Sequence, residues 1–242
     1  MASVDIVIPV YNEEHVLAQS IETLRQFLAE RPEHAWRIVV ADNASTDATL
    51  RLAEKLSDQY AEVSCIHLPQ KGRGRAIRAA WLGSDADVVS FMDVDLSTDL
   101  SALPPMVTAI ADEGYDIAIG TRLAKGSETT RSFRREFVSR VYNLLIKAMF
   151  FTRFSDAQCG FKALSREAAR ELLPHTKNEQ WFLDTEILIL AEKGGYRIKE
   201  VPVRWVEDPD SRVRVASTAW EDIRGLLRLR FSRLPRRPAK RV

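Results

Sequence analysis

Short apolar runs alternate with amphipathic segments through the first 120 residues, and this alternation restricts the possible folds more than any other feature. The segment from Leu17 to Leu28 repeats its apolar residues at helical spacing. Strands alternating with helices of this length predict an α/β fold, with a mostly parallel sheet covered by helices on both faces. The runs predicted as strands are Val4–Val10, Arg37–Ala41, Val63–Leu68, Val88–Met92 and Asp116–Gly120.

Helix starts are marked by polar residues in this part of the chain. Asn12 is predicted to cap the first helix, because short polar side chains accept hydrogen bonds from free helical N–H groups, and Thr46 or Asp47 is predicted to open the second. Two further helices are expected over Arg73–Leu82 and from Ser101.

Beyond Gly120 the alternation stops. We expect a polar loop over residues 121–132, a helix over Phe133–Phe154 and a short helix after residue 162. A helix over Trp181–Gly195, a strand over Tyr196–Val203 and a last helix over Ser217–Leu234 complete the predicted elements. The segment Phe133–Phe154 combines an apolar face with a basic flank, which is typical of a core helix or of a helix lying on a membrane surface.

Charge is distributed unevenly along the chain. Residues 211–242 hold ten lysines and arginines and two acids, a net charge of +8, whereas residues 1–210 have 25 basic and 32 acidic residues, a net charge of −7. We therefore predict one domain over residues 1–210 and a basic helix and tail over residues 211–242. A basic tail favours a negatively charged surface as partner, either nucleic acid or anionic membrane, unless it is simply solvated.

The two cysteines, Cys65 and Cys159, form neither a disulfide framework nor a zinc pattern, which favours a reducing, cytoplasmic setting. We expect no signal peptide and no membrane span. A span would need about 20 consecutive apolar residues, and the longest candidate, Val141–Phe154, is interrupted by polar side chains.

Two carboxylates, Asp93 and Asp95, directly follow the apolar strand Val88–Met92. Open α/β sheets bind ligands at the carboxyl ends of their strands, so both side chains are expected at the ligand-binding edge. Side chains in this arrangement can converge on one hard cation, and Mg²⁺ or Mn²⁺ would be the metal, with substrate phosphates completing its shell. The alternative is a strand exit followed by a helix cap.

Other polar groups are predicted at the same edge. Asp42, which ends the second strand, could accept a hydrogen bond from a base or a ribose. The segment Gln70–Ala80 contains Gly72 and Gly74, whose backbone could approach a phosphate, and Lys71 would be a neighbour for that anion. The glycines follow the third strand, not the first, so we do not expect a nicotinamide cofactor.

Nine motifs occur in the order found in inverting family 2 glycosyltransferases. Within this family the chain resembles the polyprenyl-phosphate glycosyltransferases, the group of dolichyl-phosphate mannose and glucose synthases, over about residues 4–230. The TDL after MDVDLS and the segment EDPDSRV (207–213) are more similar to the glucosyl branch. The motifs are PVYNEE, DNASTDAT, QKGRGRA, MDVDLS, GTR, RREFVSRVYN, DAQCGFK, WFLDTE and EVPVRW.

This resemblance implies a GT-A type, Rossmann-like nucleotide-sugar-binding fold and a set of site residues. Asp93 and Asp95 would hold the metal, and Arg122 and Asp184 would join them in the catalytic set. The nucleotide sugar would be bound by Pro9, Tyr11, Glu13, Asp42, Lys71, Asp93, Val94 and Asp95. The acceptor phosphate would be bound by Arg122, Arg135, Ser139 and Arg212.

Two positions depart from the family pattern. Ser97 stands where mannose synthases often have Gln, so we expect water to complete the metal shell. The second motif is DNA at residues 42–44 where DDG is usual, which removes an acid and a glycine and puts the base contacts in doubt.

The resemblance also implies a reaction. A hexose would move from a nucleotide diphosphate sugar, UDP-glucose first and GDP-mannose second, to polyprenyl phosphate, with inversion. The metal would stabilise the leaving diphosphate as a Lewis acid, and arginines would grip the acceptor phosphate. Asp184 and Glu186 are candidates for orienting the acceptor or acting as base. The enzyme would lie peripherally on the cytoplasmic face of a membrane, by surface adhesion or with a small membrane-protein partner.

Two rival functions come from other classes. The sequence Asp93–Ser97 is similar to the nucleophile motif of haloacid-dehalogenase-like phosphatases, in which the first Asp attacks phosphorus. That motif normally ends the first strand, whereas three strand–helix units precede it here. A nucleotide- or nucleic-acid-binding module would explain the basic tail, but no recognisable nucleic-acid motif is present, so we expect no nucleic-acid partner.

Overall fold

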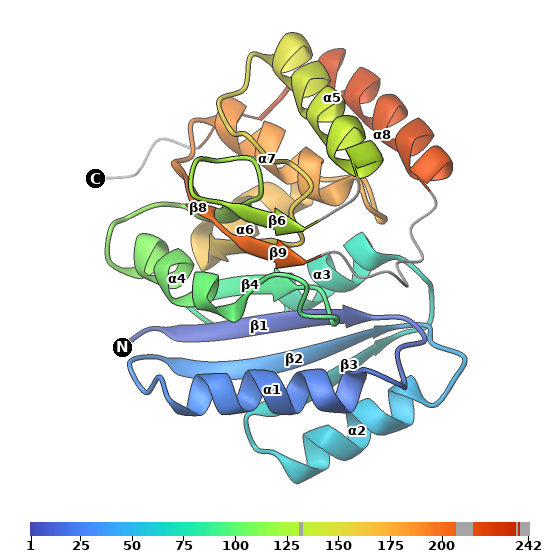
Figure 1. The fold of residues 1–242 in the computed structure, drawn as a ribbon, viewed down its shortest axis with the longest axis vertical. Coiled ribbons are helices and arrows are strands. Elements are labelled where there is room, and N and C mark those ends of the chain that lie inside the picture. Colours follow the sequence, from blue (N-terminus) through green and yellow to red (C-terminus); the bar gives the residue numbers. More distant parts are fainter. Residues whose placement is uncertain (131–132, 207–214, 236, 238–242) are drawn as a thin grey trace.

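The computed structural model describes residues 1–130, 133–206, 215–235 and 237, with the backbone alone for residues 133–135 and 215–218. Seven strands form one sheet in the order β3-β2-β1-β4-β7-β5-β8 (Figure 1). They are β1 (Ser3–Val10), β2 (Ala35–Asn43), β3 (Val63–Leu68), β4 (Val88–Met92), β5 (Ile117–Thr121), β7 (Phe161–Ser165) and β8 (Ile198–Pro202). Two short strands, β6 (Glu128–Thr130) and β9 (Arg204–Val206), pair in a separate ribbon.

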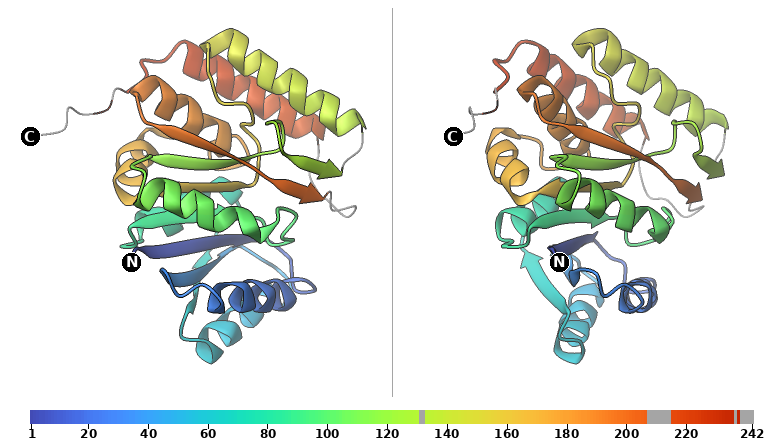
Figure 2. Two further views of the ribbon diagram at one scale, coloured as in Figure 1. Left: turned by 60° about the vertical axis from the view of Figure 1, so that its left-hand side comes forward. Right: turned by 90° about the vertical axis from the view of Figure 1, so that its left-hand side faces the viewer.

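Helices cover both faces of the sheet, as predicted. Side chains of α1, α2 and α4 pack on one face, and side chains of α3, α6 and α7 pack on the other. On this second side, α5 and α8 lie next to each other as the outermost layer (Figure 2). The α-helices are α1 (Leu17–Ala29), α2 (Thr49–Gln59), α3 (Arg73–Leu82), α4 (Leu103–Ala111), α5 (Phe133–Phe150), α6 (Arg166–Leu172), α7 (Leu183–Gly194) and α8 (Val215–Arg230). Single 3₁₀ turns, η1 (Leu100–Ala102) and η2 (Leu173–His175), precede α4 and follow α6.

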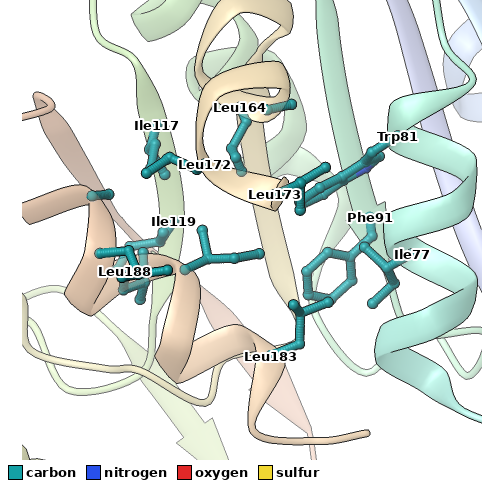
Figure 3. Close-up of a cluster of buried hydrophobic side chains, with 14 of the residues drawn as sticks. Ile77, Trp81, Phe91, Ile117, Ile119, Leu164, Leu172, Leu173, Leu183 and Leu188 are labelled. Carbon is teal, nitrogen blue, oxygen red and sulfur yellow. The ribbon is translucent and has the colours of Figure 1, made fainter. Parts of the chain in front are cut away.

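One hydrophobic core cluster packs α3 and α7 against the sheet. Trp81 of α3 and Phe91 of β4 are almost fully buried, with ring centroids 5.7 Å apart (Figure 3). Leu183 and Leu188 of α7 belong to the same cluster. Burying an aromatic or aliphatic side chain of this size contributes about 2 kcal/mol, so the cluster fixes α3 and α7 on the sheet.

The segment after α5 contains a strand that the sequence did not reveal. β7 runs antiparallel between β4 and β5, which makes the sheet mixed, whereas β1, β2, β3 and β4 are parallel. The strand has only five residues, and its second, Lys162, is completely buried. A lysine in the middle of a short run hides the apolar pattern that identifies a buried strand.

Two of the predicted helix starts were wrong. Helix α1 begins at Leu17, and Asn12 has a φ of 57°, in the left-handed region. The Asn12 side chain accepts from the Thr46 N–H at 2.8 Å, so it joins two loops and does not cap the helix. Helix α2 begins at Thr49, two or three residues later than expected, and the Thr49 N–H donates to Asp47 Oδ1 at 2.9 Å.

Two boundaries after Gly120 also differ. The predicted loop over residues 121–132 contains β6, and α5 ends at Phe150 because Phe151 takes a φ of 53°. No helix in the described part of the chain is long and apolar enough to cross a membrane.

Helix α8 is an integral part of the core, although we predicted it in a basic appendage. Leu226 and Leu229 are buried in the same cluster as the residues of α7. Gly225 lies so close to the Phe182 ring that a Cβ at this position would overlap it. The boundary at residue 210 therefore does not separate α8 from the rest of the fold; the membrane role of residues 211–242 stays a prediction.

Candidate functional site

The carboxyl ends of β1 and β2 meet at one sheet edge, as the sequence predicted. Val10 pairs with Asp42 in the parallel register, so Tyr11 and Asn43 follow side by side. Asn43 Nδ2 donates to the Val10 carbonyl at 3.0 Å, and its Oδ1 accepts from the Gly72 N–H at 2.6 Å. An amide can donate and accept at once, so Asn43, one of the family departures, ties β1, β2 and the start of α3 together.

Asp42 is completely buried at this edge. Its Oδ2 lies 2.7 Å from His67 Nδ1 and accepts from the Ser45 N–H at 3.4 Å. Its Oδ1 has no hydrogen-bond partner among the described residues. A buried carboxylate oxygen without a partner is costly, so this atom is suited to accept a hydrogen bond from a ligand.

Of the other residues predicted to bind the nucleotide sugar, some lie at this edge and one has its side chain in the core. Lys71 Nζ lies 3.4 Å from the centre of the Tyr11 ring, which joins the loop before α3 to the end of β1. Pro9 is buried within β1, and the Glu13 N–H donates to Thr49 Oγ1 at 2.8 Å. Val94 is buried in the core on the α1 side, so its side chain faces away from the edge.

Gly72 and Gly74 are closely packed in this structure, and their predicted place beside a phosphate stays a prediction. A Cβ at Gly72 would lie 2.6 Å from the Glu179 carbonyl oxygen, and one at Gly74 would lie 2.6 Å from that of Gln180. The Arg75 N–H donates to the Glu179 carbonyl at 3.0 Å. The segment before α7 therefore lies against the first turn of α3, where glycines allow its close approach.

A series of alternating charges connects β4, α3, α7 and β7. Arg73 Nη2 donates to Asp93 Oδ1 at 2.8 Å, and its Nη1 donates to Asp184 Oδ2 at 2.8 Å. Asp184 Oδ1 lies 3.4 Å from Lys162 Nζ, which donates to the Cys159 carbonyl at 2.7 Å. Burial alone would lower the pKa of Arg73, but Asp93 and Asp184 outweigh it and raise the pKa. Arg73 therefore stays charged and holds both acids in place.

The two acids after β4 suit a metal that is shared with substrate. The Asp93 side chain is 42% exposed, and the Ser97 N–H donates to Asp95 Oδ1 at 2.9 Å. The described residues include no group of three or more His, Cys, Asp or Glu that could hold a metal ion by itself. Mg²⁺ and Mn²⁺ sites often have only one or two carboxylates and take their remaining oxygens from phosphates and water. The residues present fit such an ion once a diphosphate is bound.

Arg122 follows β5 and is held by a buried acid. Its Nε donates to Asp156 Oδ2 at 2.8 Å and its Nη2 to Asp156 Oδ1 at 2.9 Å, a two-point contact with a completely buried carboxylate. Burial alone would lower the pKa of Arg122, but Asp156 outweighs it, and Asp93 adds to the rise. The Arg122 guanidinium is therefore fixed in direction and lies within electrostatic reach of Asp93.

The other three residues predicted to bind the acceptor phosphate are described to different extents. Ser139 on α5 is buried, and its Oγ has no partner in the described part of the protein. Arg135 lies in the first turn of α5, and only its backbone is described. Arg212 lies outside the described residues.

Glu186 is structural, which corrects its role as a candidate base. Its carboxylate is completely buried on α7. It accepts from the N–H groups of Lys177 and Asn178 at 3.1 and 2.8 Å, and Arg228 of α8 lies 2.8 Å away. A carboxylate with these partners orders the segment before α7 and is not available to a substrate.

Sequence reasoning missed several residues that shape the site, namely Asn43, Asp156, Gly160, Lys162 and Asp222. Gly160 leaves room for the Asp93 carboxylate, which would overlap a Cβ there. The motif DAQCGFK contains three of the five, but nothing in it shows which partners they meet.

The chain matches the model of the family described as glycosyl transferase family 2 over residues 5–173. It is 34% identical over 215 residues to glycosyltransferase AglD of Haloferax volcanii, covering 87% of this chain and 34% of that protein. It is 31% identical over 222 residues to dolichyl-phosphate beta-glucosyltransferase of Drosophila melanogaster, covering 86% of this chain and 68% of that protein.

A third relative, dolichyl-phosphate beta-glucosyltransferase ALG5C of Trichomonas vaginalis, is 28% identical over 221 residues, covering 87% of this chain and 66% of that protein. The chain thus spans about a third of the archaeal relative and about two thirds of the two eukaryotic ones.

The fold is similar to that of glucosyl-3-phosphoglycerate synthase from Mycobacterium tuberculosis. The crystal structure of that enzyme with UDP has a TM-score of 0.71 and 19% identity, covering 99% of this chain and 82% of that one. A further structure of the same enzyme contains Mn²⁺, UDP-glucose and phosphoglyceric acid, with a TM-score of 0.69 and 18% identity over 99% of this chain and 82% of that one. This likeness shows a shared glycosyltransferase fold of the GT-A type.

Proposed function

The chain belongs to glycosyl transferase family 2, and from this membership we propose that it transfers a hexose from a nucleotide diphosphate sugar to polyprenyl phosphate with inversion. Glucose from UDP-glucose is the first choice, because two of the relatives named above are dolichyl-phosphate glucosyltransferases. The observation that carries the proposal is the position of Asp93. It follows β4, which pairs with β1, so it lies at the same sheet edge as Tyr11 and Asp42, and its charge adds to the rise in the pKa of Arg122.

The donor would occupy the ends of β1, β2 and β4. Asp42 Oδ1 would accept a hydrogen bond from the base or the ribose, which would give the buried oxygen its missing partner. Tyr11 and Lys71 would flank the nucleoside, with Pro9 and Glu13 shaping the end of β1. Val94 would contribute its backbone only, since its side chain is in the core.

Asp93 and Asp95 would hold Mg²⁺ or Mn²⁺ together with the diphosphate, with water in place of a ligand from Ser97. The ion would act as a Lewis acid on the leaving diphosphate. Arg73 Nη2 donates to Asp93 Oδ1 at 2.8 Å, so the carboxylate would not need to reorganise when the donor binds.

The acceptor would occupy the side formed by β5, α5 and the loop over residues 156–158. Arg122 and Ser139 would bind the phosphate, with Arg135 and Arg212 as further candidates. A phosphate is already anionic near neutral pH, so it needs orientation and charge neutralisation more than removal of a proton. Asp184 is ion-paired to Arg73 and Lys162, and we therefore assign it to orientation and not to the role of a base. Attack from the face opposite the leaving group would give a β-linked product from an α-linked donor.

GDP-mannose remains the second candidate donor, because the residues that would contact the base do not select one base over another. The phosphohydrolase alternative is not supported. Asp93 follows the fourth strand along the chain, and the family match covers that strand as part of a glycosyltransferase.

The exposed face of α5 supports contact with a membrane. Its buried side holds Ser139, Tyr142 and Asn143 beside the apolar Ile146 and Phe150, and its exposed side is mostly apolar as well, which is unusual for a water-soluble surface. The exposed apolar side chains of α5 are Phe137, Val138, Val141, Leu144 and Leu145, and those of α8 are Trp220, Ile223 and Leu227. We call these eight residues the apolar face.

We assign a lipid surface as the occupant of the apolar face. Arg140, Arg224 and Arg230 are also exposed on these helices, and residues 211–242 carry a net charge of +8. Apolar side chains among basic ones are typical of helices that lie on anionic bilayers, where each basic residue contributes about 1 kcal/mol. The protein would then be peripheral on the cytoplasmic face of the membrane that contains its acceptor.

Co-sedimentation with vesicles of phosphatidylcholine and phosphatidylglycerol tests this surface. The double variant Leu144→Ser/Trp220→Ser should lose binding, and Leu82→Ser, a matched change of an exposed leucine on α3, should not. Equal binding by both variants would remove the apolar face from the proposal.

One experiment tests the transfer itself. The protein is incubated with radiolabelled UDP-glucose, GDP-mannose or UDP-N-acetylglucosamine, polyprenyl phosphate and Mg²⁺ or Mn²⁺, and the lipid is extracted. We expect label in the organic phase with UDP-glucose, a loss with EDTA, and a drop on the order of 100-fold for Asp95→Asn. No label in the lipid from any sugar would show that the acceptor is wrong.

A further inference from the structure

Helix α8 carries an acid, Asp222, into the interior of the protein. The residue is 3% exposed, and Gln158 Nε2 donates to its Oδ2 at 3.1 Å. Among the described residues, no cation forms an ion pair with Asp222. A buried carboxylate without a cation is expensive, so its presence needs a reason beyond packing.

A series of contacts leads from Asp222 to Arg122. The backbone N–H of Gln158 donates to Asp156 Oδ1 at 3.2 Å, and both oxygens of Asp156 accept from the Arg122 guanidinium. Asp222 thus accepts a hydrogen bond from the Gln158 side chain. The backbone N–H of Gln158 in turn donates to Asp156, the acid that orients Arg122. A change at Asp222 would move the loop over residues 156–158 and with it the direction of the Arg122 guanidinium.

The same loop is joined to Ser139 through α5. The Ala157 N–H donates to Asn143 Oδ1 at 2.9 Å, and Asn143 Nδ2 donates to the Ser139 carbonyl at 2.9 Å. Tyr142, on the same turn, has its hydroxyl 3.0 Å from Thr185 Oγ1 on α7. Helices α5, α7 and α8 and the loop therefore enclose one polar cluster that contains Asp222.

Helix α8 is held firmly enough to place Asp222. Asn178 Nδ2 donates to Glu221 Oε1 at 2.7 Å, and Arg228 pairs with the buried Glu186 at 2.8 Å. Between them, Gly225 packs closely on the Phe182 ring. These contacts fix the position of α8 along α7 and its rotation about its own axis.

We propose that Asp222 is a positioning residue for the acceptor phosphate, acting through Gln158 and Asp156 on Arg122. This inference rests on the proposed function, because it assigns the Arg122 side of the site to an anionic acceptor. It adds a residue of α8, which lies outside the segment matched by the family model, to the acceptor half of the site.

The surroundings of Asp222 make its charge sensitive to pH. Burial raises the pKa of its carboxyl to about 7, with Glu221 on the same helix and Asp184 on α7 adding to the rise, while Tyr142 on α5 lowers it. Gln158 is the neutral partner from the loop. Ionised Asp222 would oppose a second anion in this half of the site, so acceptor binding should favour its protonated form.

The test measures KM for a short-chain prenyl phosphate and for UDP-glucose across pH in detergent solution. The ratio of the wild-type KM for the acceptor to the KM of Asp222→Asn should rise about tenfold from pH 6 to pH 8. That is the ratio of the protonated fractions of a group with a pKa of about 7. KM for UDP-glucose should stay the same. Asp222→Ala, which removes the contact with Gln158 as well as the charge, should have a higher KM for the acceptor than Asp222→Asn at every pH.

Two more variants separate positioning from a merely structural role. Glu221→Gln removes one negative neighbour, so it should shift the midpoint of the profile to lower pH. Asp58→Asn, an exposed acid on α2, should match the wild type. If the wild type transfers sugar but Asp222→Asn shows the same profile, this inference is wrong and the proposed function stands. If the wild type neither binds nor glycosylates prenyl phosphate, the proposed function is wrong and the inference fails with it.

Discussion

The Asp93 carboxylate occupies the space in which a side chain at Gly160 would begin, so a Cβ at position 160 would overlap Asp93 Oδ2. β4 and β7 run antiparallel, with Met92 paired to Phe161, and this register brings the residue after one strand against the residue before the other. The lack of a side chain at one residue thus sets the position of an acid proposed to bind metal, and only the tertiary pairing reveals it.

Replacing Gly160 with Ala should therefore displace Asp93 and abolish sugar transfer while the protein stays folded. Strain from overpacking costs about 1–3 kcal/mol, less than the stability of a typical domain. Transfer rates and urea unfolding measure the two effects. Gly83→Ala, at the end of α3, is the control, because a Cβ there would meet only the carbonyl oxygens of Ala79 and Ala80, at 3.3 and 3.8 Å. Normal transfer by Gly160→Ala would show that Asp93 does not need its observed position.

Arg73→Lys should reduce both activity and stability. A lysine cannot bridge Asp93 and Asp184 as the guanidinium does, so one of these two acids loses its hydrogen bond. We expect a loss of about 3 kcal/mol in unfolding free energy and at least about 100-fold in transfer rate. Arg75→Lys is the matched control on the same helix, since Arg75 pairs with Glu179 nearer the surface. Equal effects of the two substitutions would contradict a special role for Arg73.

Asp42→Asn should weaken binding of the nucleotide. The substitution keeps the shape of the side chain but removes the charge from an oxygen that has no partner within the described residues. We expect the affinity for UDP, measured by calorimetry, to fall on the order of 10- to 100-fold, or about 1.4–3 kcal/mol. Asp58→Asn on the exposed side of α2 is the control. Unchanged UDP binding by Asp42→Asn would remove Asp42 from the donor site.

The donor edge was predictable because its signals are local. Tyr11 and Asp93 directly follow the apolar strands β1 and β4, and Asp42 is the next-to-last residue of β2. Parallel pairing brings such strand ends together. The acceptor side was less predictable for a physical reason. β7 is five residues long and contains the buried Lys162, so its pattern does not indicate a strand.

The place of α8 was hidden for a similar reason. Its arginines dominate the composition of residues 211–242 and suggest a solvated tail. The structure instead uses a narrow stripe with Asp222, Gly225 and Leu226 to pack α8 on α7. A stripe this narrow carries too few apolar residues to be distinguished from an exposed amphipathic helix by sequence alone.

Stability should depend on pH through Asp222 in a predictable direction. Its pKa rises from the ordinary value of 3.8 to about 7 in the folded protein. The folded state therefore keeps a proton that the unfolded state releases, and the associated stability is present below about pH 4 and is lost as pH rises through 7. Asp222→Asn carries no such charge, so it should become more stable than the wild type as pH rises. The gain in unfolding free energy should grow by about 3 kcal/mol between about pH 5 and pH 8 and then level off. Urea unfolding of the two proteins at each pH measures this difference.

Asp58→Asn is the control. Its unfolding free energy should not rise relative to the wild type as pH rises, because Asp58 is exposed. A gain for Asp222→Asn that does not change with pH would mean that the Asp222 carboxyl titrates in its ordinary range, and the predicted pH dependence of acceptor KM would then disappear as well.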